Sequence, residues 1–170
     1  MTVAAHSCTR RKEEFMPHGS VPDVRKWVEV DADPQRCFEV FTERMADWWP
    51  PSHVLLSKPR AGLAMEPKAG GRYYEWDEEG TEIDWGTVLE WNPPHGLRLT
   101  WRVDGRWQSV PDDERASEIE VVFTPAGPGR TRIELAHVRL DKHGPDAERI
   151  FQALDGPSPG ETLQRFSEVV

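Results

Sequence analysis

The chain has 170 residues, with 30 acidic against 21 basic side chains and a formal net charge of −9 at pH 7. This length fits one domain, and the acidic balance offers no basic surface for phosphates, which argues against nucleic acid and anionic membranes as partners. No apolar run approaches the roughly 18 residues that span a bilayer, and the N-terminal residues lack the apolar core of a signal peptide, so we expect a cytoplasmic protein.

The first predicted elements are a leader, a strand and a helix. Residues 1–22 show no periodicity and end among prolines and a glycine, so we interpret them as a flexible leader, with one domain over residues 23–170. Residues 24–30 alternate between valines and polar side chains, which predicts a strand. A helix should follow directly, because Asp33 can cap it and Pro34 suits its first turn.

The middle of the chain predicts an antiparallel meander. A short helical turn over residues 45–49 is ended by two prolines, which cannot donate backbone hydrogen bonds. Short alternating segments then follow, separated by turns rich in glycine, proline and aspartate. The predicted strands cover residues 63–66, 72–77, 82–91, 97–103, 118–125 and 130–140.

Two helices are predicted to close the chain. A short one covers residues 146–154, with its apolar side chains on one side. A longer one begins at Ser158, which together with Glu161 forms a capping box. Leu163 and Phe166 recur at helical spacing behind this cap, so we expect them to pack on the concave side of the sheet.

The tryptophans need a local explanation, since the chain holds 8 of them against 2 tyrosines. Strand alternation places Trp85, Leu89 and Trp91 on one side of their strand, and Trp101 on the apolar side of the next. These side chains are predicted to form a continuous aromatic wall. Such a wall lines a ligand cavity or simply fills a core, and the sequence leaves both readings open.

Few polar residues are candidates for a site. His137 falls on the apolar side of its strand, where an imidazole could orient a ligand, act as a general base or be a satisfied core residue. Tyr74 and Glu75 point to opposite sides of their strand, and we expect Tyr74 to face the interior because its hydroxyl suits a buried polar ligand. His53 lies in a loop near the expected mouth of the fold and is a weaker candidate.

Other reactive groups predict little chemistry. Cys37 lies in an apolar helical pattern and is expected to be a buried free thiol. The acidic run from Asp112 to Glu114 is interpreted as a solvated loop. No metal-ligand spacing, nucleophile elbow, phosphate loop or dinucleotide fingerprint occurs, so no metal or cofactor is expected.

Several blocks of sequence resemble a known family. The words FTERMADWWPP, MEPKAGGRYYEWDEEGTEIDWGTVLEWNPPHGLRLTW, ASEIEVVFTP and GRTRIELAHVRLDKHG are similar to the bacterial branch of the activator of heat-shock protein 90 ATPase homologue family, in the START-like (SRPBCC) superfamily. The resemblance runs over residues 24–170 and implies an α+β helix-grip fold, in which a curved antiparallel sheet wraps around a C-terminal helix. It also implies a cavity between sheet and helix for an apolar or aromatic small molecule. The residues expected to bind that ligand are Trp48, Tyr74, Trp76, Trp85, Trp101, His137 and Phe166.

Three functions remain open from the sequence. The first is binding of a small hydrophobic ligand without chemistry, which the absence of a catalytic signature favours. The second is a cyclase- or hydrolase-like enzyme that uses His137 or Tyr74 as acid or base. The third is interaction with a chaperone ATPase or a regulator, which the family name suggests; we discount it because the eukaryotic activators carry an additional N-terminal domain for which this chain is too short.

Overall fold

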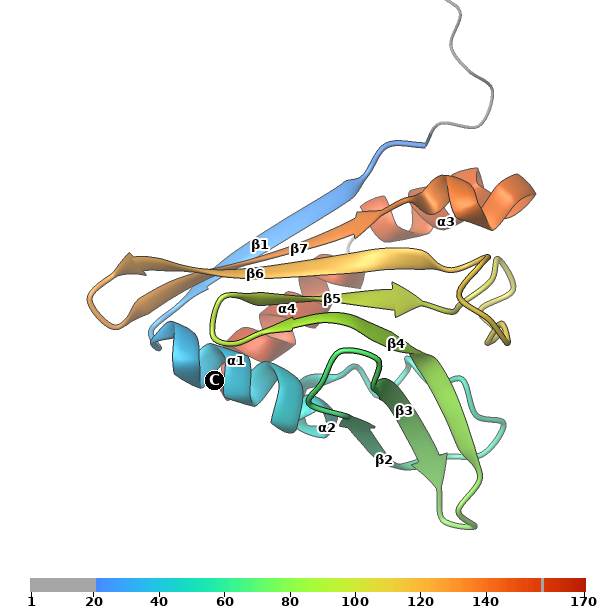
Figure 1. The fold of residues 1–170 in the computed structure, drawn as a ribbon, viewed down its shortest axis with the longest axis horizontal. Helices are drawn as coiled ribbons and strands as arrows, with labels where there is room; N and C mark the ends of the chain where they lie inside the picture. The colour runs from blue at the N-terminus through green and yellow to red at the C-terminus, as the bar shows by residue number, and fades with distance from the viewer. Residues whose placement is uncertain (1–20, 157) are drawn as a thin grey trace, which may run out of the picture.

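The structure is a computed structural model that describes residues 21–156 and 158–170, without the side chains of residues 158–160. The predicted leader therefore lies outside the described residues except for its last two positions, and so does the side chain of the predicted cap at Ser158. The described chain consists of one sheet with helices against it (Figure 1).

The sheet has seven antiparallel strands in the order β1-β7-β6-β5-β4-β3-β2, so the strand that begins the chain pairs with the strand that ends the meander. The remaining neighbours are consecutive in sequence. This confirms the meander predicted from the alternating segments. The strands are β1 (Val24–Val30), β2 (Arg60–Met65), β3 (Arg72–Asp77), β4 (Glu82–Asn92), β5 (Gly96–Trp101), β6 (Ser117–Gly127) and β7 (Arg130–Val138).

The sheet curls most strongly along β4, which pairs with β3 through its first half and with β5 through its second. Gly86 lies at the change of partner, where a Cβ atom would come within 2.1 Å of the carbonyl oxygen of Thr100. Glycine is therefore required for this close approach of the two strands. The Tyr73 hydroxyl donates to the same Thr100 carbonyl at 2.5 Å and holds β3 against the bend.

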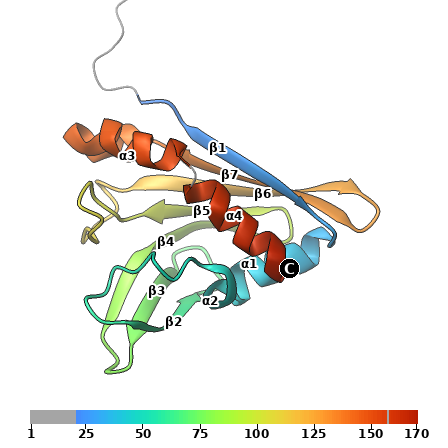
Figure 2. The same cartoon turned by 180° about the vertical axis from the view of Figure 1, so that it is seen from behind.

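Five helical segments lie against this curled sheet. The C-terminal helix α4 contacts β1, α2 and α3, and Figure 2 shows it crossing in front of the sheet. Leu163 and Phe166 of this helix are buried, as predicted. The arrangement confirms the α+β helix-grip fold. The segments are α1 (Pro34–Glu43), α2 (Met45–Trp48), η1 (Leu140–Asp146), α3 (Ala147–Asp155) and α4 (Ser158–Val169).

Helix α1 begins as its sequence predicts. The Asp33 carboxylate accepts a hydrogen bond from the backbone N–H of Arg36 at 2.8 Å, and Pro34 occupies the first turn. Cys37 is a buried free thiol, also as predicted. Its neighbour Phe38 packs edge-on against Trp91 with ring centroids 4.9 Å apart.

The predicted aromatic wall along β4 is wrong in one respect. Two register shifts interrupt the alternation of side chains along β4: one opposite β3, between Asp84 and Gly86, and one opposite β5, between Val88 and Glu90. Val88 is therefore buried while Leu89 is 36% exposed. Trp85 and Trp91 do not form one wall: Trp85 faces a cavity, whereas Trp91 packs on α1.

Candidate functional site

A cavity of about 330 Å³ lies between the concave side of the sheet, the helices and the loop that follows α2. Its volume is within the range of small-molecule sites, and most of its lining is aromatic or aliphatic. The sheet contributes side chains from four strands, including Leu99, Ile119 and Leu135. Leu154 of α3 and Thr162 of α4 lie across from them.

Five of the eight tryptophans line this cavity. The sequence had left open whether such rings line a cavity or fill a core, and these five line a cavity. Trp85 and Trp101 come from neighbouring strands, as predicted, and Trp48 comes from α2. Trp49 stands edge-on to Trp85 with ring centroids 5.1 Å apart, and Trp107 stands edge-on to Trp101 at 6.3 Å. The rings thus contact one another in pairs, a geometry that aromatic side chains favour.

Sequence reasoning missed Trp49 and Trp107 as lining residues. The Trp49 indole N–H donates to the carbonyl oxygen of His53 at 3.2 Å, so the ring is fixed to the loop after α2. Trp107 lies between β5 and β6, in a segment that read as a turn because it follows Asp104 and Gly105. The only available signal was the presence of an aromatic ring in a polar turn.

His137 on β7 lines the cavity and is 5% exposed. Its ring stands edge-on to Trp101, with centroids 5.3 Å apart. Burial, with a smaller contribution from neighbouring His143, lowers the pKa of the His137 imidazole to about 3. The ring is therefore neutral near physiological pH. Its Nδ1 is buried and has no hydrogen-bond partner among the described residues.

His53 is the other titratable side chain in the lining. It lies in the loop between α2 and β2, and its pKa is lowered by burial and by the nearby Arg60 guanidinium, with Glu161 acting in the opposite direction. The sequence placed it at the mouth with less support than His137. In the structure both histidines line the same cavity.

A buried ion pair fixes the loop that carries His53. Glu75 is completely buried, and its Oε1 accepts hydrogen bonds from the backbone N–H groups of Leu55 at 2.6 Å and Leu56 at 3.1 Å. Its Oε2 pairs with Arg60 at 3.1 Å, and Arg60 also donates to the carbonyl oxygen of His53 at 2.7 Å. Glu75 and Arg60 together therefore hold the backbone of the cavity wall, and we call them the loop clamp.

The burial of Glu75 corrects the expectation for Tyr74. Tyr73, Glu75 and Asp77 share the buried side of β3, so Tyr74 faces the other way. Tyr74 and Trp76 contact each other there, with ring centroids 5.7 Å apart, and neither lines the cavity. The prediction assigned the buried position to the tyrosine hydroxyl as a partner for a ligand, whereas the buried Glu75 carboxylate accepts hydrogen bonds from the backbone of a loop.

Phe166 also lies outside the lining. It is fully buried behind the cavity wall, edge-on to Phe41 and to Trp48 with centroids 5.6 Å away in each case. Its contact with Trp48 makes it a support for the wall. Of the residues predicted to bind ligand, the cavity brings together Trp48, Trp85, Trp101 and His137.

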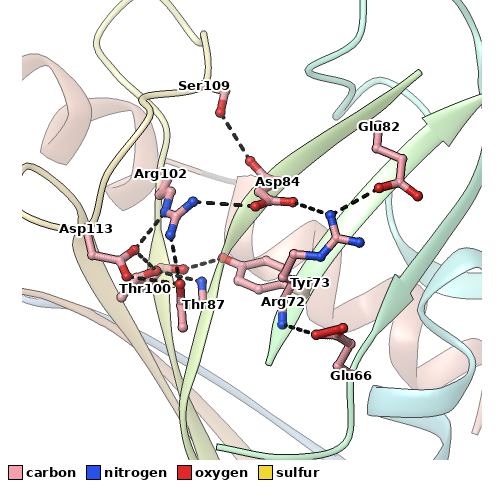
Figure 3. A network of polar contacts seen from close by, with 10 residues as sticks. All are labelled: Glu66, Arg72, Tyr73, Glu82, Asp84, Thr87, Thr100, Arg102, Ser109 and Asp113. Atoms are coloured by element: carbon pink, nitrogen blue, oxygen red, sulfur yellow. Dashed lines mark hydrogen bonds and ion pairs between the residues drawn. The ribbon is translucent and has the colours of Figure 1, made fainter. Parts of the chain in front are cut away.

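A polar network anchors the segment that carries Trp107 (Figure 3). Asp113, interpreted from the sequence as solvated, accepts hydrogen bonds from Arg102 Nε at 2.7 Å and from the hydroxyls of Thr100 and Thr87. Burial alone would raise the pKa of Asp113, but these hydrogen bonds outweigh burial and lower it. The partners of Asp113 are polar side chains on β4, on β5 and directly after β5, so strand alternation alone did not link them to a distant loop.

The described residues provide neither a cluster of metal ligands nor a membrane-spanning helix. None of their His, Cys, Asp and Glu side chains gather in a group of three or more that could hold a metal ion. Within the same residues, no helix is long and apolar enough to cross a membrane.

Comparison with known proteins gives the family and several structural neighbours. The family model "Activator of Hsp90 ATPase homolog 1-like protein" matches residues 31–154. The anthrahydroquino-γ-pyrone synthase Txn09, solved in complex with SUM, is 68% identical over 91% of this chain and 100% of its own, with a TM-score of 0.63. No curated protein matches.

More distant structures share the fold. The self-sacrificing resistance protein CalC from Micromonospora echinospora is 28% identical over 86% of this chain and 92% of its own, with a TM-score of 0.63. A protein from Nitrosomonas europaea is 19% identical over 86% of this chain and 92% of its own, with a TM-score of 0.59. The family match, together with the likeness to the synthase and to CalC, supports ligand binding or a cyclase-like function in general terms.

Proposed function

Since the chain belongs to the family of activator of Hsp90 ATPase homolog 1-like proteins and is 68% identical to an anthrahydroquino-γ-pyrone synthase, we propose that it closes γ-pyrone rings on anthrahydroquinones. The cavity carries this proposal on the structural side, because it is walled by five tryptophans. Flat aromatic rings are suited to contact with a flat polycyclic substrate. The reaction class is taken from the similar synthase, and the aromatic lining of the cavity is suited to a polycyclic aromatic substrate.

For this reaction, the main contributions of the protein are to bind the substrate and to orient its reacting groups. A γ-pyrone ring closes when a phenolic oxygen attacks the carbon β to a ketone, and negative charge then moves onto a carbonyl oxygen. Holding the two ends of one molecule at bonding distance lowers the entropic part of the barrier. A wall of apolar side chains excludes water and strengthens each hydrogen bond to the developing charge. His137 and His53 are the lining residues with imidazoles for that purpose.

Ligand binding without turnover is the second candidate. The observation in its favour is that no carboxylate, amine, guanidinium, thiol or phenol is among the described side chains that line the cavity. Proton transfer would therefore depend on two histidines whose pKa values are both lowered. Such a protein would bind a polycyclic aromatic compound and release it unchanged.

An assay with a defined substrate separates these two functions. The probe is an anthrahydroquinone with a phenolic hydroxyl beside a β-diketone side chain, kept anaerobic, and the product is that molecule less one water. We expect ring closure at least about tenfold above the uncatalysed rate, detected by mass and absorbance. Trp101→Ala should lower the rate, whereas Trp27→Ala, which alters an indole outside the cavity lining, should not.

Each result decides between the candidates. Saturable quenching of tryptophan fluorescence without product would contradict the cyclase and support the binding protein. Neither quenching nor product with this probe would contradict both.

A further inference from the structure

We propose that His137 donates a hydrogen bond from Nε2–H to a carbonyl oxygen of the bound ligand, and that it is not the base that takes the phenolic proton. The inference rests on the proposed function for the identity of the ligand, and on the surroundings of the imidazole for the direction of the hydrogen bond. It separates two roles, orienting group and general base, that the sequence could not distinguish.

The two ring nitrogens of His137 differ in their surroundings. His137 belongs to the cavity lining, yet its Nδ1 is enclosed by protein and lacks a hydrogen-bond partner among the described residues. A proton on Nδ1 would bury an N–H group without an acceptor, an arrangement that native proteins avoid more strictly than a buried lone pair. The proton of the neutral ring therefore belongs on Nε2, on the ring edge left to face the cavity.

The surroundings of the His137 ring disfavour a positive charge on it. The ring lies edge-on between apolar neighbours and Trp101, which itself stands edge-on to His143 on η1 with centroids 5.7 Å apart. His143 is the titratable group that acts on His137, and it opposes a positive charge there. No described carboxylate lines the cavity to stabilise an imidazolium. A ring that resists protonation is a poor base, but its N–H remains a good donor.

An N–H donor in this position stabilises charge that develops during ring closure. When the phenol O–H adds to the β carbon of the enolised diketone, the O–C bond forms, the electron pair of the α–β double bond moves onto the remaining ketone oxygen, and a proton is then taken up at the α carbon. The hydroxyl on the β carbon next leaves as water together with an α proton, which restores the α–β double bond of the pyrone. The addition needs no oxidant or reductant. A fixed N–H directed at the ketone oxygen stabilises the charge that develops there, as donors of an oxyanion hole do. The phenolic proton passes instead to His53, the other titratable group of the lining, or to water.

Nitrogen NMR of the full chain tests the tautomer without any ligand. In uniformly ¹⁵N-labelled protein, we expect Nε2 of His137 to show the shift of a protonated ring nitrogen and Nδ1 that of an unprotonated one. Both shifts should stay constant from about pH 8 to about pH 5, since a histidine of ordinary pKa would titrate in that range. His137→Gln identifies the signals by removing them. A proton on Nδ1, or titration near pH 6.5, would overturn the proposal.

A pair of ligands of the same shape tests the hydrogen bond. Anthraquinone carries carbonyl oxygens and anthracene does not, so we expect the wild type to bind anthraquinone about tenfold more tightly, measured by tryptophan quenching. His137→Gln retains an N–H donor and should keep most of this preference, whereas His137→Leu should abolish it. Circular dichroism establishes that both variants are folded. An unchanged preference in His137→Leu would contradict the proposal.

Turnover adds a separate comparison. If His137 is a donor, His137→Gln should keep a substantial part of the ring-closing rate while His137→Leu loses about a hundredfold. Equal losses in the two variants would indicate a base instead. Failure to find any ring closure would reject the cyclase but leave the tautomer and the ligand preference as independent results, so the two proposals can fail separately.

Discussion

Trp107 combines an exposed aromatic ring with a backbone conformation that residues with a Cβ atom avoid. Its φ angle is 60°, and its side chain is 45% exposed although it lines the cavity. The Asp104 carboxylate accepts hydrogen bonds from the backbone N–H groups of Arg106 at 2.8 Å and Gln108 at 3.0 Å, which holds the turn in this shape. In this conformation the indole lines the cavity and stands edge-on to Trp101.

A matched pair of variants separates the strain at this residue from the ring that it carries. Trp107→Gly and Trp107→Ala both remove the indole, but only glycine adopts the left-handed conformation without cost. We expect the glycine variant to be more stable than the alanine variant by about 1 kcal/mol in urea unfolding, with equally weakened affinity for anthraquinone. Equal stabilities would show that the turn stores no strain.

Among the elements, the loop after α2 depends most on a single interaction. The loop clamp combines a completely buried Glu75 with an Arg60 side chain that is 11% exposed. A buried carboxylate is tolerated because a guanidinium and two backbone N–H groups all donate to it. The clamp connects the register of β2 and β3 to the position of His53 in the cavity wall.

Glu75→Gln should therefore disturb both stability and binding. The variant removes the charge and leaves the Arg60 guanidinium without its partner, which should cost about 3 kcal/mol in unfolding free energy. Weaker quenching by anthraquinone should accompany this loss because the loop is no longer fixed. Glu79→Gln is the control: its ion pair with Lys58 is exposed, so less than about 1 kcal/mol should be lost. Similar losses in both variants would mean that the clamp is not specific.

The helices and strands differ in how well the sequence predicted them. The cap at Asp33 and the helical spacing of Leu163 and Phe166 are local signals, and the structure confirms the elements that they predicted. The irregularity at Val88 and the inward side of β3 depend on contacts with other strands and loops, so periodicity did not reveal them. Within the site, alternation placed His137, Trp85 and Trp101 inside, whereas Trp107 depended on the conformation of a loop.

At the scale of the whole molecule, histidines make the fold sensitive to acid. Burial lowers the pKa of His137, His53 and His143 in the folded state, whereas the unfolded chain titrates near the ordinary value of 6.5. Below that value the unfolded state binds more protons than the native state. Stability is therefore complete above about pH 6.5 and is lost as the pH falls toward the folded pKa values.

Urea unfolding at two pH values measures this linkage. Between about pH 7 and about pH 5, each fully linked histidine should reduce the free energy of unfolding by about 1.4 kcal/mol per pH unit below its unfolded pKa. His137→Gln should remove close to one such contribution, while the half-buried His53 and His143 account for a smaller remainder. If the variant lost stability on acidification as steeply as the wild type, His137 would not be buried as a neutral ring.

The pairing of β1 with β7 has a consequence for how the chain reaches this state. Val24 lies opposite His137, so the first strand of the domain finds its partner only after the whole meander has been made. Contacts between such distant parts of a chain form slowly, and β1 leaves the ribosome with an unpaired edge. The histidine that we place against the ligand is thus fixed by the last pairing that synthesis allows. The cavity is complete only when β7 has been synthesised, because Leu135 and His137 of this strand line it. A nascent fragment without β7 therefore cannot bind the ligand in this way.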